Sequence, residues 1–196
     1  MIAVINSGLA NISSVVFALN RLGVDAQVTT DPKVISAATH VILPGVGAAQ
    51  MAMKNLTALN LTDLIPKLTQ PVLGICLGMQ LLFEHSEEGN VACLGVFPGE
   101  IKKLVGDGLI IPHMGWNTLS IRKPSALLAG IPDESYVYFV HSYCAPVADH
   151  TIATTQYGQD FSAIIQRDNF YAMQFHPERS GELGERLLRN FVGIQR

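Results

Sequence analysis

The stretch Pro71-Val72-Leu73-Gly74-Ile75-Cys76-Leu77-Gly78-Met79-Gln80-Leu81-Leu82-Phe83 predicts a strand, a sharp turn and a helix in direct succession. Residues 72–75 form a short apolar run typical of a buried strand, and apolar residues at helical spacing follow to about His85. Cys76 stands between two glycines, as in a nucleophile elbow with Cys in place of Ser. Glycines let strand and helix approach closely, and a helix N-terminus favours the reactive thiolate. The alternative is that Cys76 is a small buried core residue.

A cysteine nucleophile needs a base, and the base needs an orienting group. Residues 170–175 predict a strand, and His176-Pro177-Glu178 follows it directly. In extended backbone, residues two apart point to the same side, and Pro177 pushes His176 toward extended geometry. Glu178 can then hold the imidazole in one tautomer while the other ring nitrogen faces the thiol. Taken alone, the tripeptide is more typical of a loop with a solvated Glu178, so the elbow elsewhere in the chain carries the assignment.

Composition excludes several classes of protein. A chain of 196 residues with 48% apolar and 15% charged residues fits one folded domain over residues 1–196. The net charge of −3 gives no electrostatic case for nucleic acid or an anionic membrane. The three cysteines lack paired spacing and no Cys-x-x-Cys occurs, so we expect no disulfide framework, no metal and no cofactor. No signal peptide and no apolar run of about 20 residues are recognisable, so we expect a cytoplasmic protein without a membrane span.

Alternating strand and helix patterns indicate an α/β fold. Strands are expected at 2–5, 25–29 and 40–43, with helices to about Leu22, from Asp31-Pro32, at 51–59, at 61–68 and at the C-terminus around 183–191. The strand at 2–5 is apolar throughout, which is typical of an open, mostly parallel sheet with helices on both faces, as in flavodoxin-like folds.

A second region has short strand patterns between Gly and Pro turns. We expect a small antiparallel β appendage from residues 91–97, 101–105, 109–111 and 118–121, with His113-Met114-Gly115-Trp116 as a turn inside it. One helical turn at 125–129, a strand at 136–140 and a hairpin of 151–157 with 161–166 complete the chain.

Three turns follow strands, where open α/β sheets bind ligands. Pro44-Gly45-Val46-Gly47 leaves backbone N–H groups that can bind an oxyanion, although a plain strand-to-helix turn needs no such role. Gln80 lies one helical turn after Cys76 and can reach a substrate held there, or else it is an ordinary exposed glutamine. His141 is a second candidate base, but it lacks an acidic orienter and is ranked as structural or substrate-adjacent.

Together, the segments 74–80, 44–47 and 176–178 resemble the three motif blocks of the class I glutamine amidotransferases. Pro112-His113-Met114-Gly115-Trp116-Asn117 and Tyr138-Phe139-Val140-His141-Ser142-Tyr143 are similar to motifs of the glutaminase subunits of imidazole glycerol phosphate synthases. The resemblance covers nearly the whole chain. It implies a Cys76–His176–Glu178 triad.

The resemblance also implies roles for further residues. The oxyanion hole would use the amide of Val46, next to Gly47, and that of Leu77. Glutamine contacts would come from Gly45, Gln80, His141, Ser142 and Tyr143, and the partner face from Asn11, Met114, Trp116, Tyr138 and Arg179. Two positions depart from the family pattern: Ala49 replaces an aromatic residue, and Cys144 stands where the family often has Arg or Lys.

The implied activity is hydrolysis of glutamine to glutamate and ammonia. The ammonia would pass through a tunnel to a (β/α)8 cyclase subunit, which uses it to form imidazole glycerol phosphate and an aminoimidazole carboxamide ribotide in histidine biosynthesis. The two subunits would form a heterodimer that is activated when the cyclase binds its own substrate. Two alternatives stay open: a glutaminase of anthranilate or pyridoxal phosphate synthesis, against which the Met114-Gly115-Trp116 block weighs, and a non-catalytic regulatory module, against which the intact triad weighs.

Overall fold

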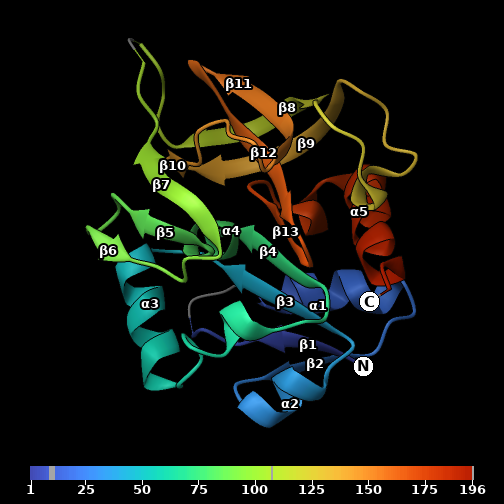
Figure 1. The fold of residues 1–196 in the computed structure, drawn as a ribbon. Coiled ribbons are helices and arrows are strands. Elements are labelled where there is room, and N and C mark those ends of the chain that lie inside the picture. The colour runs from blue at the N-terminus through green and yellow to red at the C-terminus, as the bar shows by residue number, and fades with distance from the viewer. Residues whose placement is uncertain (9–11, 107, 196) are drawn as a thin grey trace.

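The computed structural model describes residues 1–8, 12–106 and 108–195, in which the strands form a nine-stranded and a four-stranded sheet (Figure 1). The large sheet has the order β2-β1-β3-β4-β13-β12-β11-β8-β9. Its parallel half comprises β2 (Ala26–Thr29), β1 (Ile2–Ile5), β3 (His40–Gly45), β4 (Val72–Cys76) and β13 (Phe170–Met173). Its antiparallel half comprises β12 (Gln159–Arg167), β11 (Thr151–Tyr157), β8 (His113–Ile121) and β9 (Ser135–His141).

Helices cover both faces of the parallel half, as expected. One core combines α1 (Ile12–Arg21) and α5 (Gly181–Gly193) with Ile2 and Val4 of β1. The opposite core combines α2 (Pro32–Ala37), α3 (Ala49–Ala58) and α4 (Leu77–Leu81) with Ala3 and Ile5 of the same strand. Side chains alternate between the two faces of a strand, so a strand buried on both faces must be apolar at every position. The predicted α/β fold is confirmed.

The expected second sheet is present, but only part of it comes from the expected segments at 91–97 and 101–105. Its order is β10 (Tyr143–Cys144), β7 (Phe97–Lys103), β5 (Phe83–Ser86) and β6 (Val91–Ala92). The outer pairs are antiparallel, whereas β5 and β7 run parallel. The described residues 109–111 lie outside any strand, and residues 118–121 belong to β8 of the large sheet. The expectation of a turn at 113–116 was wrong: these residues pair with β9, and Gly115 in mid-strand concealed the alternation of side chains.

Two expected helices are shorter than the patterns indicated. The helix after Cys76 ends at Leu81 rather than His85, because residues 83–86 pair as β5 and bury Phe83 against Phe97, with ring centroids 5.7 Å apart. The pattern at 61–68 yields only a 3₁₀ turn at Ile65–Lys67, which contains a proline. The expected turn at 125–129, found at Ala126–Leu128, and the hairpin of β11 and β12 are confirmed.

The topology brings the ends of three strands together. β3, β4 and β13 are direct neighbours and run parallel, so the turns at 44–47, 76–80 and 176–178 meet at one edge of the sheet. Edge strand β9 joins them, since the His176 amide donates to the Tyr138 carbonyl at 2.9 Å. None of the helices in the described ranges is both long and apolar enough to cross a membrane.

Candidate active site

The elbow predicted around Cys76 is present. Cys76 ends β4 and directly precedes α4 with φ 53° and ψ −111°, a positive-φ conformation that is strained for a residue other than glycine. A Cβ on Gly78 would overlap the carbonyl oxygen of Leu43, so only glycine lets α4 pack this closely on β3. The strain is therefore maintained by close packing and presents the thiol at the strand's carboxyl end.

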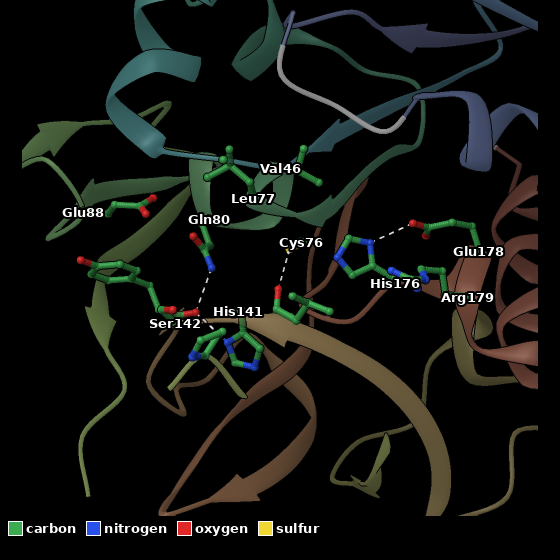
Figure 2. Close-up of a pocket in the computed structure, with 14 residues that line it drawn as sticks. Val46, Cys76, Leu77, Gln80, Glu88, His141, Ser142, His176, Glu178 and Arg179 are labelled. Atoms are coloured by element: carbon green, nitrogen blue, oxygen red, sulfur yellow. Dashed lines mark hydrogen bonds and ion pairs between the residues drawn. The ribbon is translucent and has the colours of Figure 1, made fainter. Parts of the chain in front are cut away.

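His176 and Glu178 form a buried pair beside the thiol. Nδ1 of the imidazole lies 2.8 Å from Oε1 of the carboxylate, and the side chains are 10% and 2% exposed. Figure 2 shows the imidazole between Cys76 and Glu178. The local backbone differs from the expected extended one: His176 is extended, but the chain turns at Pro177 and Glu178 lies in a 3₁₀ turn. The turn, rather than strand alternation, brings the two side chains together.

The electrostatics of the pair favour a charged imidazole. Burial opposes the charge on His176, but the Cys76 side chain and the Glu178 carboxylate outweigh burial and raise the pKa of His176 to about 10. An imidazolium beside a cysteine favours the nucleophilic thiolate and can donate a proton to a leaving group. By contrast, burial raises the pKa of both Cys93 and Cys144 to about 11.

The thiol opens into a cavity of about 310 Å³, the small end of the range for ligand sites. Most of the residues predicted to act here line it: Val46, Gly47, Cys76, Leu77, Gln80, His141, Ser142, Tyr143, His176, Glu178 and Arg179. Among the described residues, the predicted glutamine contact Gly45 does not line the cavity. Its missing side chain instead lets β3 pack closely on Leu77. Ser142 lies where the chain passes from β9 of the large sheet to β10 of the small one.

Gln80 is buried rather than exposed on its helix, with 4% of its surface accessible. Its Nε2 donates to the Tyr143 carbonyl at 2.9 Å and to Oε1 of Gln174 at 3.0 Å. The side chain thus connects α4 to the β9–β10 junction and to the end of β13.

His141 belongs to a hydrogen-bonded chain of neutral groups. Its Nδ1 donates to the Tyr143 carbonyl at 2.8 Å, so its Nε2 accepts from Nδ1 of His113 at 3.0 Å. Nε2 of His113 then accepts from Nδ2 of Asn117 at 3.3 Å. Burial lowers the pKa of His141 to about 3 and that of His113 to about 4. The geometry supports a structural role for His141 and leaves His176 as the candidate base.

Sequence reasoning missed Glu88, which lines the cavity from the β5–β6 turn. Its Oε2 accepts from the Ala49 amide at 2.8 Å, at the N-terminus of α3. Nothing in the local sequence singled it out, because its approach to the site depends on how the small sheet packs. Within the described parts of the chain, no cluster of His, Cys, Asp or Glu could hold a metal ion.

The residues predicted for a partner face lie beside the cavity. Met114 and Trp116 are 62% and 55% exposed on β8. The Trp116 ring meets the Tyr138 ring edge-on at 5.8 Å, and the Arg179 guanidinium lies 4.7 Å from the Tyr138 ring centroid. Arg179 also lines the cavity, so this aromatic surface is continuous with the site. Asn11, the remaining predicted partner residue, lies outside the described residues.

Solved structures of other proteins share the fold of this chain. A crystal structure of a glutamine amidotransferase matches with a TM-score of 0.76 at 18% identity, covering 98% of this chain and 97% of that one. A chain of the PurLQS structure from Thermotoga maritima matches with a TM-score of 0.74 at 17% identity, covering 98% and 97%.

Comparison with known sequences identifies the family. The imidazole glycerol phosphate synthase subunit HisH of Vibrio cholerae is 50% identical, over 98% of this chain and 98% of its own length. The protein of the same name from Xanthomonas axonopodis pv. citri is 52% identical, over 97% of this chain and 96% of its own length. The model of the family described as glutamine amidotransferase class-I matches residues 3–194. This chain therefore belongs to the class I glutamine amidotransferase family.

Proposed function

We propose that this chain is the glutaminase subunit of an imidazole glycerol phosphate synthase and acts in histidine biosynthesis. The observation that carries the proposal is the strained Cys76 thiol beside the His176–Glu178 pair, at the floor of a cavity of about 310 Å³. Relatives with this name and about half of their residues identical to this chain support it. We place the activity in the cytoplasm, where reducing conditions keep a catalytic thiol usable.

The proposed reaction has two steps. The Cys76 thiolate attacks the side-chain amide carbon of glutamine, and the imidazolium of His176 protonates the departing ammonia. The neutral imidazole then takes a proton from water, which hydrolyses the γ-glutamyl thioester to glutamate. Glu178 holds the imidazole through the 2.8 Å hydrogen bond to Nδ1, so that the other ring nitrogen serves both steps.

The oxyanion of each tetrahedral intermediate is assigned to backbone amides at the carboxyl ends of β3 and β4. Leu77 begins α4 next to the thiol, and the turn of Val46 and Gly47 lines the same cavity. A donor of this kind is typically worth ~3 kcal/mol of transition-state stabilisation. We assign one donor to the Leu77 amide and the other to the turn at Val46.

The amino-acid end of glutamine is assigned to the opposite part of the cavity. The Glu88 carboxylate would attract the α-amino group, and the backbone around Ser142 and Tyr143 would hold the carboxylate end. Gln80, held between β9–β10 and β13, shapes the wall between this part and the thiol.

The partner is assigned to the surface formed by Met114, Trp116, Tyr138 and Arg179. Exposed aromatic and Met side chains together with Arg are typical of protein interfaces. A cyclase subunit docked there would receive ammonia from the cavity. Docking at Arg179 could bias the turn at 44–47 between an unproductive and a productive amide orientation, which would couple the two sites.

The decisive experiment measures glutamate release from glutamine by the purified chain, alone and with the cyclase subunit and its substrate. We expect release to rise when both are present, and the cyclase to be retained in a pull-down. Absence of glutamate release with the cyclase and its substrate would refute the proposal, and activation by an anthranilate or pyridoxal phosphate synthase instead would favour the alternative glutaminases.

Arg179→Ala tests the coupling separately. Loss of about 0.5–2 kcal/mol of coupling would reduce the activation by the cyclase roughly 2- to 30-fold. Arg189→Ala serves as the control. Arg189 is an exposed arginine on α5, and its ion-pair partner among the described residues is Glu185, one helical turn away. An unchanged activation factor together with an unchanged cyclase affinity would show that Arg179 takes no part.

A further inference from the structure

Gln174 is a buried polar residue that none of the motifs assigned to the site includes. It lies between the end of β13 and His176, with 0% of its surface exposed. Its side-chain amide spans two residues of the site: Oε1 lies 3.0 Å from Nε2 of Gln80, and Nε2 lies 3.8 Å from Sγ of Cys76.

Hydrogen-bond chemistry determines which way this amide faces. The Tyr143 carbonyl can only accept, so the Gln80 atom 2.9 Å from it must be the NH₂ group. The same nitrogen meets Gln174, so the Gln174 atom at that contact must be its oxygen. The NH₂ group of Gln174 therefore faces the sulfur. Because His141 also donates to the Tyr143 carbonyl, at 2.8 Å, the far end of this chain of hydrogen bonds is anchored from two sides.

The sulfur has different partners in its two protonation states. As a thiol, Cys76 donates to the Val140 carbonyl at 3.7 Å. As a thiolate it has no proton to donate, and a carbonyl oxygen beside it is repulsive. The NH₂ group of Gln174 remains a donor in both states, and its hydrogen bond becomes charge-assisted when the sulfur is ionised.

We propose that Gln174 is a positioning residue for glutamine hydrolysis, which holds the Cys76 sulfur as the reactive thiolate and ties it through Gln80 to the Tyr143 carbonyl beside the cavity. Only the catalytic consequence of this inference rests on the proposed glutaminase function. The effect of Gln174 on the sulfur can be measured without turnover, so the inference and the proposed function can fail separately.

The test is the rate at which iodoacetamide alkylates Cys76, followed by mass spectrometry of its peptide as a function of pH. Gln174→Met has a similar volume but neither donor nor acceptor. We expect the midpoint of the alkylation profile to move about one pH unit upward, so that the rate at pH values below the wild-type midpoint falls about tenfold. Glutaminase assays with the cyclase should show a comparable fall in kcat with KM changed by less than about threefold.

Gln70→Met is the matched control, because Gln70 is also buried, 2% exposed, and donates its amide to the Ile35 carbonyl away from the site. It should leave the alkylation profile unchanged. If Gln174→Met fails to fold, Gln174→Asn keeps a primary amide but is one methylene too short to reach the sulfur, and the same upward shift is expected.

An alkylation profile identical to that of wild type in a folded Gln174 variant would overturn the inference, since a merely structural residue would alter stability alone. A shifted profile in a chain that the cyclase cannot activate would leave the role of Gln174 intact and refute the proposed function instead.

Discussion

Acid is expected to destabilise this protein through the buried His113–His141 pair. The rings share a 3.0 Å hydrogen bond, and each nitrogen already has its role as donor or acceptor set by its neighbours. A proton added to either ring would turn an acceptor into a second donor facing a donor. Burial lowers the pKa of His113 to about 4 and that of His141 to about 3, and the fixed hydrogen bonds oppose protonation in the same direction.

Proton linkage gives the sign and the size of this change in the free energy of unfolding with pH. Because both folded-state pKa values lie below the unfolded value of about 6.5, the unfolded chain binds protons first as the pH falls. Stability is therefore complete above about pH 6.5 and decreases toward pH 4. At pH 5.5 the loss is about 1.4 kcal/mol for each histidine, set by the unfolded-state pKa. His176 contributes with opposite sign, since its raised pKa adds stability that is complete below pH 6.5 and lost as the pH rises through about 10.

Comparing a variant with wild type cancels the contribution of His176. His113→Asn keeps an amide nitrogen near the position of Nδ1 but does not titrate. In urea unfolding, the free-energy cost of this substitution should be smaller at pH 5.5 than at pH 7.5 by about 1–1.5 kcal/mol. Leu56→Ala is the control: Leu56 is fully buried on α3 in the opposite core, so the substitution leaves the burial of His113 unchanged and its cost should be equal at both pH values.

A cost of His113→Asn that is the same at the two pH values, within about 0.5 kcal/mol, would refute the reasoning. It would mean that the folded protein accepts the proton as easily as the unfolded chain, and that the chain of neutral hydrogen bonds does not constrain the rings.

Three further outcomes are expected. Cys76→Ser should keep its unfolding midpoint but release no glutamate, and a glutamine-like alkylating agent should label Cys76 alone in wild type; labelling of another cysteine with Cys76 untouched would contradict the assignment. Glu178→Gln should reduce kcat less than His176→Ala does, because the imidazole remains as a base; equal and complete loss in two folded variants would speak against this division. Gly78→Ala should lower the free energy of unfolding by about 2–3 kcal/mol in urea titrations, because its Cβ would overlap the Leu43 carbonyl; unchanged stability would show that α4 can move away from β3.

Several errors in the sequence-based prediction arose from short patterns. Phe83 continues the apolar spacing of α4, yet residues 83–86 form β5, because pairing with β7 and burial of Phe83 outweigh a weak helical preference. Gly115 interrupts the alternation of β8, so the exposed Trp116 was expected in a turn rather than on the sheet. In both cases the deciding interaction comes from another segment of the chain.

The sequence by itself determined the features that depend on neighbouring residues. An apolar strand, Gly-x-Cys-x-Gly and a following helix specify the elbow locally, since only glycine permits the close approach of α4 to β3. Apolar strands and amphipathic helices likewise specified a sheet covered on both faces. For the same reason, the candidate nucleophile and its His176-Pro177-Glu178 partner could be predicted from short motifs.

The tertiary structure alone decided which distant groups surround those motifs. Glu88 reaches the cavity only because the small sheet packs beside α3, and the amide of Gln174 meets the sulfur only because β13 lies next to β4. The neutral state of His141 depends on His113, 28 residues away, and on burial that no local pattern encodes. Hydrogen-bond direction and desolvation are set by the neighbours that a group meets in space, so they become defined only when the chain has folded.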